Sequence, residues 1–206
     1  DIDSTHPHYD AFKKIENAVE EGSELTRQLM GYARKGRYRS RAVAINDIIE
    51  NTSQTFQKMK KEIIIHREYT QRPHAIEADQ GQMEQMLLNL YINAADAMPD
   101  GGDIYLKTKN VTHRDIKSHL YEPRPGKYIR ITVSDTGMGI DKKIQHRIFD
   151  PFFTTKKTGK GTGLGLASVY GIVKSHDGYI NAESEKGCGT TFFIYLPVAD
   201  KKKTKR

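Results

Sequence analysis

Residues 135–166 organise the rest of the chain, and the two ends of this segment must be considered together. It begins with DTGMGID at 135–141, directly after the alternating segment YIRITVS at 128–134, and it ends with KGTGLGL at 160–166, directly before an apolar helical pattern. The first end is typical of a strand that delivers a carboxylate and then turns on glycines. The second is typical of a glycine loop that opens a helix, where free N–H groups and the helix dipole favour an anion. The pairing predicts a nucleotide pocket.

Three familiar phosphate-binding loops do not fit this stretch. A P-loop needs Ser or Thr after its Gly-Lys pair, and here Lys160 is followed by Gly161. The dinucleotide fingerprint needs a third glycine at 166, where the chain has Leu166. The partner motifs of the protein-kinase glycine loop are absent from the sequence. The pocket therefore belongs to another class of nucleotide-binding protein.

Composition excludes several classes of protein. Of 206 residues, 36% are hydrophobic and 29% are charged, which allows a core beneath a highly charged surface. No apolar run approaches the roughly 18 residues of a membrane helix. The single cysteine, Cys188, excludes an internal disulfide framework and a cysteine-based zinc site. We expect a soluble, cytoplasmic setting and no membrane contact by this part of the chain.

The net charge of +7 owes much to residues 200–206, which contain five basic residues and one acidic residue. A solvated end or the start of a linker accounts for such a tail more simply than a nucleic-acid-binding arm does. We therefore expect no nucleic-acid partner.

Hydrophobic spacing predicts helices and strands in mixed order. Residues 10–35 are predicted to form a long amphipathic helix, whose apolar stripe would need a hairpin partner or a dimer mate. A shorter helix, capped at Asn46 and Asp47, runs to about residue 58, a third helix runs from its cap Asp79 to residue 98, and a fourth ends at His176. Strands are expected at 63–65, 75–78, 103–108, 128–134, 179–183 and 190–196. With its late antiparallel pair, this order predicts an α+β two-layer sandwich.

The helix at 79–98 carries an unusual polar edge. Asn89, Asn93 and Asp96 fall together beside the buried stripe, where an ordinary amphipathic helix has apolar or long charged side chains. Asparagine carbonyl oxygens suit Mg²⁺, which proteins usually share with nucleotide phosphates. The alternative is that these side chains are bonded to backbone groups, and both interpretations stay open.

Five segments, in order, resemble the motif boxes of sensor histidine kinases. They are NLYINAADA at 89–97, DTGMG at 135–139, IFDPFFTTK at 148–156, GTGLGLA at 161–167 and GCGTTF at 187–192. One glycine box would carry little information, whereas five boxes at the right spacing are very specific. The resemblance covers nearly the whole chain and implies the mixed-sheet α+β fold that histidine kinases share with gyrase.

The resemblance also implies a domain organisation. The helix at 10–35 is similar to the second helix of the dimerisation hairpin in that family. The predicted domains are therefore a partial hairpin at 1–41, an ATP-binding domain at 42–199 and a basic tail at 200–206.

Roles for individual residues follow from the same resemblance. Asn93 would bind Mg²⁺, Asp135 would accept a hydrogen bond from the adenine amino group, and Thr190 would support the adenine. The glycines of the 135–139 box would let the backbone approach the base, and main-chain amides of 161–166 would hold the phosphates. Lys156 and Lys160 either reach the phosphates or remain solvated charges. The residues predicted to bind Mg·ATP are Asn89, Asn93, Asp96, Asp135, Gly137, Gly139, Thr155, Lys156, Lys160, Gly161, Thr162, Gly163, Leu164, Gly165, Leu166 and Thr190.

The phosphoacceptor histidine of the family is not recognisable in this sequence. The family's acceptor is followed by an acidic residue, whereas His6 precedes Pro7 and His8 precedes Tyr9. We expect the acceptor helix upstream of this chain, so that the chain binds Mg·ATP but phosphorylates itself little or not at all. The implied partners are that helix, a receiver domain and, in the full-length protein, a second copy.

Two other functions compete with histidine phosphorylation. Hydrolytic ATPases of the gyrase and heat-shock chaperone group share this pocket, but they use a glutamate as general base where this chain has Asn89. A non-enzymatic nucleotide-binding scaffold would bind ATP without transferring phosphate. His176 and Cys188 are interpreted as packing and turn residues.

Overall fold

The computed structural model describes residues 8–9, 12–13, 40–116, 122–156 and 161–199, and the chain divides into a unit Asp1–Gly36 and a unit Arg37–Arg206. The predicted helix at 10–35 lies outside the described residues, except for Phe12 and Lys13, which are helical. The tail at 200–206 lies outside them as well, so the predicted domain boundaries stay predictions. Within the described ranges, no helix combines the length and the hydropathy needed to cross a bilayer.

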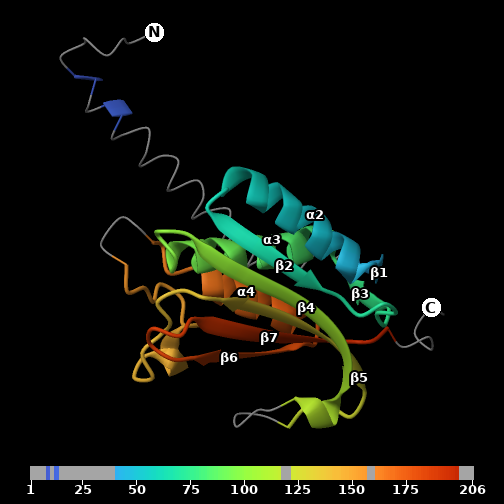
Figure 1. The fold of residues 1–206 in the computed structure, drawn as a ribbon. Coiled ribbons are helices and arrows are strands. Elements are labelled where there is room, and N and C mark those ends of the chain that lie inside the picture. The colour runs from blue at the N-terminus through green and yellow to red at the C-terminus, as the bar shows by residue number, and fades with distance from the viewer. Residues whose placement is uncertain (1–7, 10–11, 14–39, 117–121, 157–160, 200–206) are drawn as a thin grey trace. The chain divides into compact units, whose positions relative to one another are not determined.

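A five-stranded mixed sheet forms one layer of the second unit (Figure 1). Its strand order is β2-β4-β5-β7-β6. β2 runs parallel to β4, and the other neighbours are antiparallel. The strands are β2 (Ile63–Glu68), β4 (Gly102–Thr112), β5 (Lys127–Asp135), β6 (Tyr179–Ser184) and β7 (Thr190–Pro197). A separate two-stranded sheet pairs β1 (Arg41–Val43) with β3 (Ile76–Ala78).

Three helices form the second layer and cover one face of the sheet (Figure 1). They are α2 (Ile45–Met59), α3 (Gln80–Asp96) and α4 (Gly165–Ser175), and two short 3-10 turns lie at η1 (His113–Asp115) and η2 (Gln145–Arg147). Fully buried side chains of β4, β5 and β7 pack against α3 and α4, which makes one core between the layers. The predicted α+β two-layer sandwich is confirmed.

The helix caps show how far local signals reach. Asp79 caps α3 as predicted, since its Oδ1 accepts a hydrogen bond from Gln82 N at 3.1 Å. The predicted cap of α2 is wrong, because α2 begins at Ile45, after Ala44, without a side-chain cap. Asn46 instead donates from Nδ2 to Thr70 O at 3.0 Å and accepts from Thr108 Oγ1 at 2.9 Å. The side-chain amide of Asn46 is therefore bonded to residues outside α2 and does not cap the helix.

His176 has the packing role that the sequence suggested. Its Nδ1 donates to Ile172 O at 2.8 Å, and its Nε2 accepts from Asp79 N at 3.1 Å. The imidazole thereby joins the last turn of α4 to the first turn of α3. Cys188 is exposed, in the turn before β7.

Candidate nucleotide-binding site

Asp135 is a buried carboxylate at the end of β5. It is 9% exposed and lies opposite Thr190 in the register of β5 and β7. Its Oδ1 accepts hydrogen bonds from Gly137 N at 2.9 Å and from Thr190 N at 3.2 Å. Because both bonds end on Oδ1, Oδ2 stays available to a donor on a ligand. Burial raises the pKa of Asp135, while the two N–H donors act in the opposite direction.

The turn after Asp135 is clamped to the end of α3. Met138 N donates to Ala97 O at 3.0 Å, and a Cβ on Gly137 would lie 2.7 Å from both Ala97 Cβ and Ala97 O. Gly139 has a φ of +65°, and a Cβ there would lie 2.0 Å from Glu185 O. Contacts within the protein therefore already require both glycines. The predicted approach of this backbone to the base stays a prediction.

Two supporting residues of this corner were missed at the sequence level. Ser184 Oγ accepts from Ile140 N at 2.8 Å and donates to Gly189 O at 2.8 Å. Gln145 Nε2 donates to Ser184 O at 2.5 Å. These bonds connect the loop after Asp135 with the turn before Thr190. No local pattern signals the bonds of Ser184 to Ile140 and to Gln145, because these partners lie 44 and 39 residues away in the chain.

The polar edge of α3 meets the start of α4. Asn89 Nδ2 donates to Gly165 O at 3.4 Å, and Asn93 Nδ2 donates to Asn89 O at 2.8 Å. Both amide nitrogens are thus bonded to backbone, as the alternative interpretation expected, while the carbonyl oxygens remain suited to a cation. Within the described part of the chain, no three or more His, Cys, Asp or Glu side chains are placed to hold a metal. A Mg²⁺ site here would depend on amide oxygens and on phosphates of the ligand.

The N-terminus of α4 has the features of a phosphate site. Leu164 precedes it without a side-chain cap, and its first turn contains no acidic residue. The first helical hydrogen bond at this end runs from Ser168 N to Leu164 O at 2.8 Å. The N–H groups that precede Ser168 in the first turn are the ones that an α-helix leaves without an intrahelical partner. Gly163 has a φ of +67°, and a Cβ added at this position would lie 2.4 Å from the carbonyl carbon of Phe152. The loop therefore packs tightly on the 149–156 segment.

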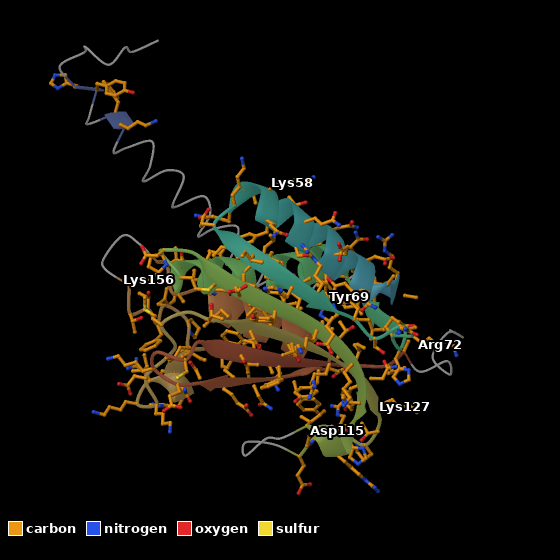
Figure 2. The ribbon with its side chains drawn as sticks, in the orientation of Figure 1. Lys58, Tyr69, Arg72, Asp115, Lys127 and Lys156 are labelled. Carbon is orange, nitrogen blue, oxygen red and sulfur yellow. The ribbon has the colours of Figure 1, made fainter. Side chains whose placement is uncertain are left out.

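Lys156, which Figure 2 labels, lies in the segment between η2 and α4. Its Nζ is 2.5 Å from Oδ2 of Asp96. Of the remaining predicted residues, Thr155 and Thr162 are exposed and Leu164 is buried. Thr162 Oγ1 accepts from Leu164 N at 3.3 Å. Lys160 lies outside the described residues. The structure thus brings Asn89, Asn93 and Gly165 together, and separately Asp135, Gly137 and Thr190.

Comparison with known proteins identifies relatives of this arrangement. Residues 78–200 match the family described as histidine kinase-, DNA gyrase B-, and HSP90-like ATPase. The sensor kinase CckA of Brucella abortus (strain 2308) is 38% identical over 196 residues, which are 94% of this chain and 21% of CckA. The signal transduction histidine-protein kinase AtoS of Escherichia coli (strain K12) is 30% identical over 193 residues, which are 93% of this chain and 29% of AtoS. The chain thus spans less than a third of the length of these relatives.

Solved structures agree with the sequence matches. The catalytic domain of histidine kinase ThkA has a TM-score of 0.61 at 27% identity, covering 79% of this chain and 96% of that domain. The mycobacterial sensor histidine kinase MprB has a TM-score of 0.61 at 25% identity, covering 77% of this chain and 97% of that chain.

Proposed function

The chain belongs to the histidine kinase-, DNA gyrase B-, and HSP90-like ATPase family as an ATP-binding domain of the sensor histidine kinase type, and we propose that it donates the γ-phosphoryl group of Mg·ATP to a histidine of its own full-length protein. The acceptor helix, a receiver domain that takes the phosphoryl group onward and a homodimeric assembly are parts of this proposal. They rest on the similarity to sensor kinases that are several times longer than this chain.

The observation that carries the proposal is the state of Asp135. A carboxylate that is only 9% exposed is costly to bury, and its two backbone bonds leave Oδ2 uncommitted. An amino group of a purine is a donor of the right kind for that oxygen. Adenine presents such a donor, whereas the corresponding position of guanine is an acceptor. The site therefore favours ATP over GTP.

The phosphates would lie at the other side of the site, on the free amides that open α4 and on the glycine loop before it. Asn93 Oδ1 would hold Mg²⁺, with Asn89 and Asp96 nearby on the same edge of α3. The metal, when bound, supplies the charge neutralisation that phosphoryl transfer requires. Nδ2 of Asn93 is already bonded to Asn89 O, so its oxygen is pre-oriented for a cation.

Transfer to a protein side chain is favoured over hydrolysis by the chemistry of Asn89. A hydrolytic enzyme needs a group that accepts a proton from water. The amide of Asn89 cannot accept one, and its nitrogen is bonded to Gly165 O. This position therefore orients the start of α4 rather than activating water.

The test is a labelling experiment with γ-labelled Mg·ATP and a longer protein that carries the upstream helix, incubated alone or mixed with the present chain. Acid-labile label on a histidine supports the proposal. Steady release of free phosphate without labelled protein would indicate a hydrolytic ATPase, and nucleotide binding without either product would indicate a scaffold. Asp141→Asn changes an exposed aspartate in the same loop as Asp135. It is the control for substitutions of Asp135 and should keep full activity.

A further inference from the structure

We propose that the ion pair between Asp96 and Lys156 makes the site selective for metal-bound ATP over the free nucleotide. In this proposal, which rests on the proposed nucleotide-binding function, Lys156 neutralises Asp96 until a phosphate takes the ammonium group. A cation held at Asn93 then compensates the released carboxylate. Asp96 thereby acts as a positioning and selectivity residue and not as a ligand of the metal.

The first support is the place of Asp96 in its helix. Asp96 is the last residue of α3, where the negative end of the helix dipole disfavours an acidic side chain. The last turn of α3 contains no basic residue that could compensate it. The compensating cation comes instead from Lys156, 60 residues further along the chain. The carboxylate therefore depends on a lysine from a separate segment.

The second support is the course of the Lys156 side chain. Its backbone N donates to Thr154 Oγ1 at 3.2 Å, and a Cβ on Gly161 would lie 2.9 Å from Lys156 Cδ. The aliphatic part of the lysine therefore runs against the glycine loop that precedes α4. Its ammonium group ends on Asp96 Oδ2, 2.5 Å away. The ammonium group of Lys156 thus contacts the carboxylate of Asp96, while its aliphatic chain runs beside the loop on which we propose the phosphates bind.

The third support is the spacing along α3. Asn93 and Asp96 are three residues apart, so their side chains lie on the same side of the helix. A divalent cation on Asn93 would therefore be close enough to stabilise Asp96 once Lys156 has left. Without that cation, a phosphate that binds the Lys156 ammonium group leaves the Asp96 carboxylate without a counter-charge, next to the negative charge of the phosphate. Binding of metal-free ATP carries this electrostatic cost, whereas binding of metal-bound ATP does not.

The pair is partly solvated, which limits its strength. The two side chains are 35% and 45% exposed. An ion pair of this kind is worth at most about a fivefold change in an equilibrium constant. Relief of repulsion between Asp96 and phosphate acts in the same direction when the carboxylate is removed. We therefore expect Asp96→Asn to tighten the binding of metal-free ATP about fivefold.

The test is a set of dissociation constants for ATP with excess EDTA, ATP with Mg²⁺, and AMP. The proteins are the wild type, Asp96→Asn, Lys156→Gln, the double variant and, as the matched charge control, Asp100→Asn, which changes an exposed aspartate just after α3. For Asp96→Asn we expect tighter metal-free ATP, nearly unchanged Mg·ATP and unchanged AMP, which lacks the phosphates that reach Lys156. The gain in affinity for metal-free ATP on replacing Asp96 should be clearly smaller in the Lys156→Gln background. Asp100→Asn should bind all three nucleotides as the wild type does.

Each other outcome overturns the proposal. Weaker Mg·ATP with unchanged metal-free ATP would make Asp96 a metal ligand. The same gain with and without Lys156 would make Asp96 a simple source of repulsion. An equal change in the dissociation constant of AMP would indicate a local structural defect. Unchanged dissociation constants for all nucleotides would show that the ion pair between Asp96 and Lys156 does not affect binding. If the wild type itself binds no ATP, the proposed function fails first, and the two failures are thereby distinguished.

Discussion

Replacing Asp135 by asparagine separates binding from folding more cleanly than any other change in this site. Both hydrogen bonds to the side chain end on Oδ1, and an asparagine Oδ1 can accept the same two N–H groups. Only Oδ2 changes, from an acceptor to an NH₂ donor. The fold should survive this substitution, while an adenine amino group would meet a donor instead of an acceptor.

The expected loss of affinity follows from one hydrogen bond to a charged group. Such a bond contributes about 1.5–3 kcal/mol, and a buried donor left without a partner costs a similar amount. A net loss of about 3 kcal/mol corresponds to roughly a 100-fold weaker dissociation constant. Isothermal titration with Mg·ATP measures it directly, and Asp141→Asn serves again as the control.

Stability should change in the opposite direction. Burial raises the pKa of Asp135 above its ordinary value of 3.8, so the folded state binds the proton more tightly than the unfolded chain does. The cost of the buried charge is therefore absent below the unfolded pKa and appears as the pH rises through the folded pKa. Asparagine removes this cost, so the variant should be more stable than the wild type at pH 7, with a difference that shrinks below about pH 4.

Urea denaturation at several pH values, on the same preparations, tests the sign of this effect. Binding of ATP by Asp135→Asn with wild-type affinity would refute the adenine assignment, which depends on Oδ2. A variant less stable than the wild type at pH 7 would show instead that the two backbone bonds need a charged acceptor.

Two further changes test the metal and the glycine turn. Asn93→Ala should weaken ATP binding about tenfold in Mg²⁺ and little in EDTA, since only one cation ligand is lost; an equal loss in both buffers would contradict the metal role. Gly139→Ala should destabilise the fold by roughly 2–4 kcal/mol in urea denaturation, because it combines a positive φ with a clash against Glu185 O. Gly126→Ala, whose Cβ would meet nothing closer than 3.8 Å, is the neutral control, and equal stability of the two variants would refute the strain.

Much of the fold could be predicted because its signals are local. The α3 helix shows them together: an apolar stripe, a cap at Asp79 and a polar edge all lie within one stretch of chain. The strands β5 and β7 alternate clearly and were placed to within one residue. The strand β1 and the far end of β4 were missed, because the three residues of β1 are too few to show a period and Thr112 is in a strand through its pairing with Lys127.

The residue types of the site follow from the sequence alone, since a carboxylate before glycines and a glycine loop before a helix are patterns of adjacent residues. Tertiary packing sets how those groups are held. It bonded the two α3 asparagines to backbone carbonyls, joined the glycine turn to Ala97 and Ser184, and paired Asp96 with Lys156. A hydrogen bond or ion pair between distant segments forms only where the packed layers bring those segments together. The periodicity of the sequence does not show which segments become neighbours.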